Sequence, residues 1–260
     1  MQSIPVFIPK WALWQDHAAQ PTLMTQQSGN TPIGIDTKDL ARDIAPVWRR
    51  RLDLFGRASA EVLSQILVGL PENQLRNTRV IFASRHGNIE RTLKLLGQIA
   101  RAEIPSPADF SMSVHNALVG VASINWAITQ SHSAISAGND SFIAALTEAL
   151  AQLTDDRQSP VAIVYVDLPL PDIYARNDPA DMTGTAFAML MQTDESVATN
   201  TGFTFEPRPV SPTDVTETTE TFARTHACMM ARFLKVEKEN APSTCLLAGR
   251  SFAWNVLRNE

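Results

Sequence analysis

Short, continuous apolar runs along the chain alternate with longer stretches whose apolar residues recur at helical spacing. A continuous run predicts a buried strand, because a strand covered on both faces has no side left for polar residues. The clearest runs lie at residues 79–83, 161–166 and 186–191, and shorter ones lie at 4–8, 245–248 and 252–256. Residues 203–205, with the proline-rich stretch after them, are expected to add an edge strand.

Helical spacing predicts the elements between these strands. Residues 37–70 predict one long helix that ends before Pro71, and residues 89–99 and 215–236 predict two more. Trp11 and Trp14 are three apart, a spacing that would place both on one face of a helix. The polar stretch 15–36 contains prolines and glycines, so we expect a loop or excursion there.

The stretch from residue 110 to residue 150 organises the rest of the chain. It predicts a helix, a short connection, a strand and a second buried helix. We expect the strand to end at residues 135–136, Gly138 and Asn139 to form a turn, and Asp140 or Asn139 to cap the second helix. Such a turn resembles a nucleophile elbow, but it reads Ala-Gly-Asn-Asp and carries no cysteine. The mixed order of elements predicts a single α/β domain over residues 1–260.

Composition and charge narrow the class of protein. The chain has 44% apolar and 19% charged residues and a net charge of −5, which is ordinary for a globular protein without a nucleic-acid footprint. The basic run at residues 49–51 is too short to change this. No apolar stretch is long enough for a membrane span, and the N-terminus is a poor signal peptide. Cys228, Cys245 and five histidines show no metal-ligand spacing, so we expect a cytoplasmic, metal-free protein.

Several polar residues allow both a chemical and a structural interpretation. His115 with Asn116 could be an acid/base group with its amide partner, or a buried histidine bonded to the backbone. Ser141 could be a nucleophile if a base lies nearby, although a serine in the first turn of a helix is commonly a cap. The turn at residues 84–87 could hold a phosphate or carboxylate, or be only a polar turn. Cys228 is expected in the core, and His226 lies on a different helix face.

Two longer motifs carry a resemblance to a known family. The runs SPADFSMSVHNALVGVASI and SAISAGNDSFIAALTEAL, flanked by FASRHGNIERT and VYVDLPLP, resemble the β-ketoacyl synthase N-terminal-like family. More specifically, they are similar to the short ketosynthase chain-length-factor proteins of aryl polyene biosynthesis. The matching region spans residues 82–171 and includes the VHNA-x-x-G motif, which is its most specific part.

The resemblance implies a thiolase-like half-fold with αβα layers, truncated relative to a full ketosynthase. Complete ketosynthases carry a catalytic cysteine at the elbow of their first half and two histidines in their second half. Here Gly138 aligns with the cysteine, and the sequence ends at Glu260, so we expect neither the thiolate nor the histidine pair.

The function implied is that of a non-catalytic chain-length factor without cofactors. It would pair with a catalytic β-ketoacyl synthase, shape the acyl tunnel at the shared interface, and meet an acyl carrier protein through that complex. If the segment at residues 110–114 is extended, its larger side chains would point to one side, toward the tunnel of the partner. The expected partner-facing or tunnel-wall residues are Phe110, Met112, Val114, His115, Asn116, Gly138, Asn139 and Phe142. The competing hypotheses are an acyl-thioester transferase or hydrolase that uses Ser141 or His115, and a purely structural scaffold.

Overall fold

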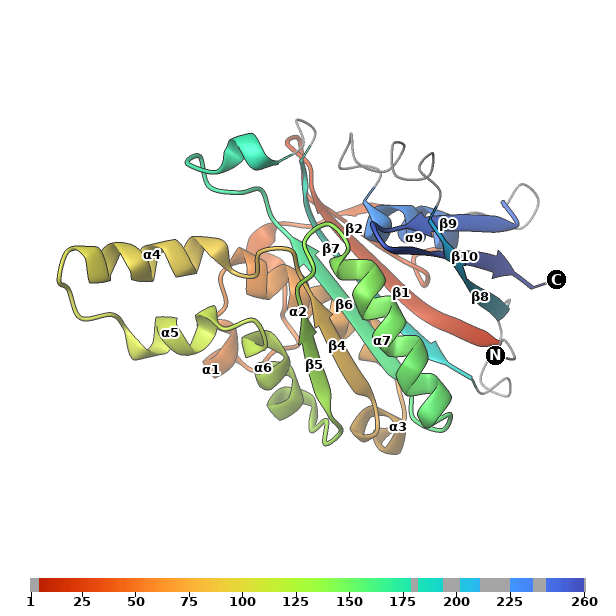
Figure 1. Ribbon diagram of the computed structural model, residues 1–260. Coiled ribbons are helices and arrows are strands. Elements are labelled where there is room, and N and C mark those ends of the chain that lie inside the picture. Colours follow the sequence, from red (N-terminus) through yellow and green to blue (C-terminus); the bar gives the residue numbers. More distant parts are fainter. Residues whose placement is uncertain (1–4, 179–181, 194–201, 211–224, 236–241, 260) are drawn as a thin grey trace.

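One mixed sheet runs through the protein in the computed structural model, which describes residues 5–178, 182–193, 202–210, 225–235 and 242–259. Its main strands lie side by side in the order β5, β4, β6, β7, β1, β8, β10 and β9 (Figure 1). Their bounds are His132–Ile135 (β5), Arg79–Ala83 (β4), Val161–Asp167 (β6), Gly184–Gln192 (β7), Val6–Asp16 (β1), Gly202–Pro209 (β8), Phe252–Arg258 (β10) and Thr244–Ala248 (β9). Two short strands, β2 (Thr22–Thr25) and β3 (Ile33–Gly34), attach beside β1.

Parallel pairing is confined to one side of the sheet. Strand β4 runs parallel to both β5 and β6, and the remaining strand pairs are antiparallel. Among the described strands, β5 pairs only with β4, so its other side forms an open edge of the sheet.

Helices cover both faces of the sheet, with α7 in front and α2 behind in the view of Figure 1. Helix α9 joins α7 on the front face, and α6 packs beside α2 on the other. The main helices are α2 (Leu54–Leu67), α4 (Ile89–Ala100), α5 (Pro107–Ser113), α6 (Ala117–Trp126), α7 (Ser141–Asp155) and α9 (His226–Lys235). Shorter helical pieces are η1 (Thr37–Asp39), α1 (Pro46–Arg49), α3 (Glu72–Arg76) and η2 (Ala175–Asn177). The layered α/β fold expected from the sequence is confirmed.

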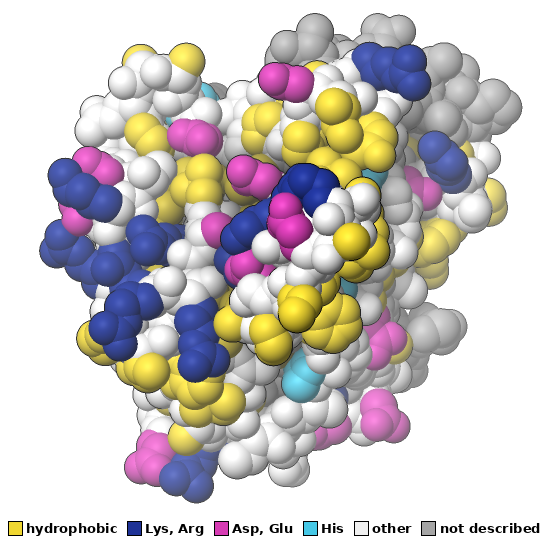
Figure 2. All heavy atoms as spheres, turned by 90° about the vertical axis from the view of Figure 1, so that its left-hand side faces the viewer, with side chains coloured by type: hydrophobic (Ala, Val, Ile, Leu, Met, Phe, Trp, Pro, Cys, Tyr) yellow, Lys and Arg dark blue, Asp and Glu magenta, His cyan; other side chains and the backbone are white. Residues whose placement is uncertain are grey.

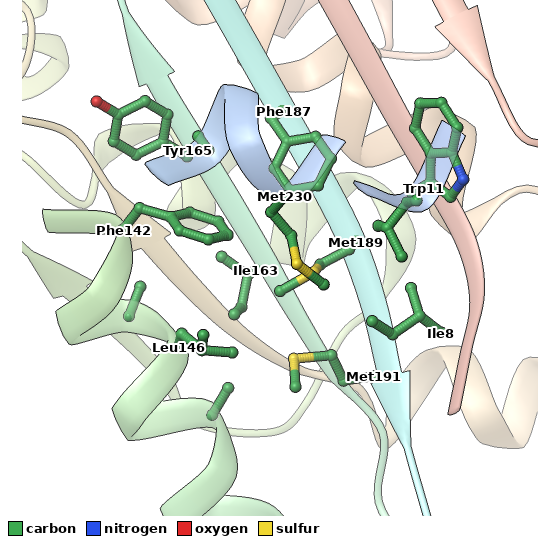
Figure 3. Packing of buried hydrophobic residues seen from close by; sticks show 14 of the residues in the cluster. Ile8, Trp11, Phe142, Leu146, Ile163, Tyr165, Phe187, Met189, Met191 and Met230 are labelled. Carbon is green, nitrogen blue, oxygen red and sulfur yellow. The ribbon is translucent and has the colours of Figure 1, made fainter. Parts of the chain in front are cut away.

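Strand β6 shows why the apolar runs are continuous. Its side chains point alternately to the two faces, with Ile163 and Tyr165 in a first core under α7 and α9, and Val164 in a second core against α2 and α6. Figure 3 shows the first core, where Phe142 of α7 meets Phe187 of β7. Every residue of β6 is buried, as expected for a strand that helices cover on both sides.

The prediction that Trp11 and Trp14 share a helix face is wrong. Both lie on β1, which continues to Asp16 instead of ending at residue 8. The register of β1 against β7 shifts between Phe7 and Lys10, so Pro9 sits at an irregularity, where a missing N–H is tolerated. An odd spacing on a strand separates the two indoles, with Trp11 in the first core and Trp14 in the second.

The long helix predicted at residues 37–70 is interrupted. Its first part contains only η1 and α1, and α1 begins at Pro46 because proline lacks the N–H that a helix interior requires. Helix α2 then starts anew after Asp53, whose carboxylate accepts a hydrogen bond from the N–H of Gly56 at 3.1 Å. Only the part after Asp53 shows the expected amphipathic spacing.

Three other predictions need correction or limits. Residues 203–205 belong to β8, which lies between β1 and β10 and is not an edge strand. The excursion at residues 15–36 contains β2 and β3. The helix predicted at 215–236 is described only as α9, because residues 211–224 lie outside the described part of the chain.

Helices α4 and α5 together form an arm, residues 89–113, that projects from the body of the protein (Figure 1). The expectation that residues 110–114 are extended is therefore wrong for all but the last, because α5 runs to Ser113. Ser106 caps this helix and Pro107 occupies its first turn, where a proline is favourable. None of the described helices is long and apolar enough to cross a membrane.

Candidate functional site

The elbow, residues 136–140, connects the edge strand β5 to helix α7, where the sequence predicts a turn. Gly138 has φ +59°, a left-handed conformation that glycine adopts at little cost. A Cβ added there would meet nothing within 4 Å, so the requirement is conformational and not one of close packing. The elbow geometry is therefore present, and its exposed central residues are glycine and Asn139.

The side chain of Ser141 stabilises the elbow through hydrogen bonds to its backbone. Its hydroxyl donates to the carbonyl of Gly138 at 2.7 Å and accepts from the N–H of Ala137 at 2.9 Å. The side chain is buried, and no histidine is among its hydrogen-bond partners in the described part of the chain. A serine nucleophile needs a general base within hydrogen-bond distance, so this geometry favours the turn-forming role.

Asp140 occupies the predicted cap position of α7, but its carboxylate does not cap the helix. Instead it accepts a hydrogen bond from the N–H of Arg250 at 2.9 Å, in the turn between β9 and β10. This contact ties the elbow to the C-terminal hairpin, a long-range role that local sequence does not predict.

His115 is bound to the backbone, the structural one of its two interpretations. Its Nε2 lies 3.1 Å from the carbonyl oxygen of Ile135, which can only accept, so Nε2 carries the proton. The ring packs edge-on against Phe82 with centroids 5.5 Å apart, and a Cβ at Gly87 would come within 2.7 Å of Nδ1. Among the described contacts, none joins His115 to the side chain of Asn116, which is exposed.

The cysteines provide no reactive thiolate near the elbow. Cys228 is buried in α9, as predicted. Burial raises the pKa of the Cys245 thiol to about 11, so it is protonated at neutral pH. His226, at the start of α9, is also buried, and burial lowers its pKa below the ordinary value. Its Nε2 bonds to the carbonyl of Ala248 at 2.8 Å, a structural role.

The turn at residues 84–87 binds carboxylates that belong to the chain itself. Nε of Arg85 donates to Asp167 at 2.9 Å, and Nη2 of Arg85 donates to Asp178 at 3.0 Å. Ser84 and Tyr165 also donate to Asp167. Burial, together with the Asp167 carboxylate, raises the pKa of Tyr165 well above its ordinary value, so the phenol remains a donor. Because this guanidinium is buried and already paired with two carboxylates, the turn is not an open anion site.

The arm is held by ion pairs but leaves apolar side chains in solvent. Arg91 pairs with Asp53 and Asp109, each at 2.8 Å, and Lys94 pairs with Asp109. Figure 2, seen from the side of the arm, shows apolar side chains gathered on this face. The exposed large apolar residues of the arm and of the chain just beyond it are Leu96, Ile99, Ile104, Phe110, Val114 and Ile124. Ile104 is 93% exposed and Phe110 65% exposed.

The predicted site residues therefore separate into two groups. Phe110, Val114, Asn116, Gly138 and Asn139 reach the surface. Phe142 does not, because it packs edge-on against Tyr165 in the first core, so we correct its expected role from interface wall to core. Met112 packs against the second core. The open edge of β5 and most of the apolar arm were not predicted from the sequence. The helical spacing of Leu96 and Ile99 could have indicated the arm.

The mixed sheet, the helices on both of its faces and the elbow after an edge strand form an α/β fold that solved ketosynthase structures share. The chain is similar to one in a ketosynthase (ApeO) in complex with its chain length factor (ApeC) from Xenorhabdus doucetiae, at 23% identity and a TM-score of 0.71. That match covers 98% of this chain and 100% of the other. The ishigamide ketosynthase/chain length factor matches at 11% identity and a TM-score of 0.71, over 98% and 99% of the two chains.

A β-ketoacyl synthase from Burkholderia phymatum STM815 is less similar in structure, with a TM-score of 0.55 at 14% identity. That match covers 89% of this chain and 70% of the other. Residues 11–255 match the family described as "Beta-ketoacyl synthase, N-terminal domain". The chain belongs to this family, and the resemblance read from the sequence is confirmed. No match is found among proteins of curated function.

Proposed function

We propose that this chain is a non-catalytic, ketosynthase-like subunit that pairs with a catalytic β-ketoacyl synthase and acts as its chain-length factor. The elbow carries the proposal. It has the strand-to-helix geometry and positive φ of a nucleophile turn, yet it presents Gly138 where the family resemblance places a cysteine. The Ser141 hydroxyl is occupied by the turn, and the hydroxyl of Ser136 donates to the carbonyl of Arg85 at 2.7 Å, so neither serine is paired with a general base among the described residues.

Two surface features support pairing with a partner. No described strand pairs with the outer side of β5, so its backbone N–H and C=O groups there are available to another strand. The neighbouring arm exposes a group of large apolar side chains, and such groups commonly mark interaction sites. The base of the arm lies close to the end of β5, because the imidazole of His115, just beyond the arm, contacts the carbonyl of Ile135.

The names of similar structures agree with this proposal. Two of them contain a ketosynthase and a chain length factor, and a third contains a type II polyketide acyl carrier protein in complex with its ketosynthase. By analogy, we propose that an acyl carrier protein delivers the growing chain to the complex and that the pathway resembles aryl polyene biosynthesis. A cytoplasmic location and the absence of cofactors are part of the same proposal.

The segment before α6 is proposed to contribute to the wall of the shared tunnel. Its helical conformation separates its side chains, since Phe110 and Val114 are exposed and Met112 contacts the second core. The tunnel and interface role therefore falls on Phe110 and Val114. Asn116, Gly138 and Asn139 are further exposed residues on the partner-facing side.

A matched pair of variants tests this assignment. In a complex reconstituted with the catalytic partner, Phe110→Ala is expected to lengthen the acyl product with little change in melting temperature, because the side chain is mostly in solvent in this chain. Met112→Ala is expected to cost about 2 kcal/mol of stability and to leave product length unchanged, because it truncates a packed side chain. Product length and melting temperature are measured on the same preparations.

The alternatives predict other results. If Phe110→Ala forms the complex normally and changes neither product length nor yield, the segment is not part of the tunnel. If removing the whole chain leaves the partner's product length and yield unchanged, the chain is a structural scaffold. Turnover of acyl thioesters by the isolated chain would instead favour the independent enzyme.

A further inference from the structure

A cleft of about 350 Å³ opens at the carboxyl ends of β4 and β6. It lies between the turn after β4 and the loop after β6, outside the segment proposed above as tunnel wall. Its apolar wall consists of Phe55, Ile89, Leu168, Pro169 and Pro171. A cleft of this volume, at this place in an α/β sheet, is typical of sites for small molecules.

A small cavity of about 10 Å³ lies between the wall of this cleft and the proposed tunnel segment. The cleft and the small cavity share Asp53, Phe55 and Asn88, and the small cavity is also lined by Val114 and His115. It has room for about one water molecule. The side chains that separate the cleft from residues 112–115 are therefore few, and Phe55 is the largest of those the two share.

Phe55 is supported from the side of the elbow. Its ring contacts Phe82 with centroids 6.1 Å apart, and Phe82 contacts the imidazole of His115. The ring is only partly buried, so it can be replaced without opening a large void in the core. This position suits a residue that limits how far a chain entering past Val114 can reach.

The charges around the cleft select the kind of occupant. Among the described residues, no lysine or arginine lines it, and His86 is also part of its lining. Asp53 and Asp167 are neutralised by ion pairs with Arg91 and Arg85, whereas Glu90 and Asp172 have no partner among the described residues. The two uncompensated carboxylates disfavour an anion, and an uncharged apolar chain can lie on the apolar wall.

We propose that this cleft receives the distal, uncharged end of the growing acyl chain, and that Phe55 sets how far the chain extends into it. The inference rests on the proposed function, because the other end of the chain is then held as a thioester on the partner or its carrier protein. It adds a binding site inside this subunit, beyond the interface segment at residues 110–114.

Binding to the full-length chain alone tests the cleft directly. Calorimetric titration with 1-octanol is expected to show binding, and octanoate of the same length is expected to bind at least tenfold more weakly. Ile89→Trp, which fills the cleft from its wall, is expected to weaken octanol binding at least tenfold. Ile33→Trp, the same enlargement at an exposed position on β3 that lines neither cavity, should leave it unchanged. Equal binding of octanol and octanoate, or no effect of Ile89→Trp, would overturn the proposal.

Product length in the reconstituted complex tests the role of Phe55. Phe55→Ala is expected to shift the products to longer chains, and Ile89→Trp to shorter ones. An intact complex with unchanged product lengths in both variants overturns this inference but leaves the proposed function standing. A wild-type chain that forms no complex with any ketosynthase overturns the proposed function instead, whatever the octanol titration shows.

Discussion

Replacement of Ala134 by proline is expected to abolish pairing with the ketosynthase partner while leaving the chain itself folded. The carbonyls of Ser131 and Ile135 point toward β4, because they accept hydrogen bonds from the N–H groups of Val80 and Ser84. Successive residues of a strand direct their backbone groups to opposite sides. The N–H and C=O of Ala134, next to Ile135, therefore point away from β4, toward the open edge. Proline removes an outward N–H and adds a ring there, and proline on an edge strand blocks the pairing of another strand.

Ser133→Pro is the matched control for this prediction. Its N–H points toward β4, so proline at this position is expected to lower the melting temperature of the isolated chain. Co-purification with the tagged partner and thermal unfolding distinguish the two variants. If Ala134→Pro pairs as tightly as the wild type, the edge of β5 is not the interface.

Loss of the Arg85 guanidinium is expected to cause a large loss of stability. Asp167 and Asp178 share this cation, and both carboxylate side chains are almost completely buried. Arg85→Met leaves them without a counter-charge, which is expected to lower the free energy of unfolding by about 3–5 kcal/mol. Arg85→Lys should recover only part of this, because an ammonium cannot reproduce the planar, forked contacts.

Arg101→Met is the control, because its ion pair with Glu103 is exposed and is expected to contribute less than about 1 kcal/mol. Urea unfolding followed by circular dichroism gives the free energies of all three variants and the wild type. An Arg85→Met variant within 1 kcal/mol of the wild type would show that the buried carboxylates do not depend on this arginine.

The central strands were predictable because their burial leaves a signal in the sequence. Helices cover both faces of β4, β6 and β7, so the side chains on either face are apolar and the runs are continuous. The elbow was predictable for a similar local reason, since Gly138 and Asn139 follow a strand and precede an amphipathic helix. The positive φ of Gly138 confirms that glycine meets a conformational requirement there.

The errors arose where distant parts of the chain decide the structure. A spacing of three between Trp11 and Trp14 suits one face of a helix, but it also suits opposite faces of a strand, and pairing with β7 selected the strand. The position of β8 inside the sheet depends on the C-terminal strand β10. The carboxylates that occupy Arg85 come from residues 82 and 93 positions away, so local sequence could not exclude a free anion site.

The candidate site could be predicted only in part from the sequence. The family motif located the elbow and the segment at residues 110–114, but it could not show which side chains are exposed. All four candidate side chains are large and apolar, so residue type does not distinguish them. Phe142 and Met112 contact the cores of this chain, whereas Phe110 and Val114 are exposed to solvent. The open edge of β5 has no sequence signature, because it is defined by the absence of a neighbouring strand.

The most direct test of the central claim is the mass of each subunit after acyl transfer. The chain is co-purified with a candidate catalytic ketosynthase, incubated with acyl-loaded carrier protein, and both subunits are analysed by intact-protein mass spectrometry. If this chain is non-catalytic, we expect a stoichiometric acyl adduct on the partner and none on this chain. A stoichiometric adduct on this chain, mapped to any of residues 136–142 in the elbow and the first turn of α7, would contradict this.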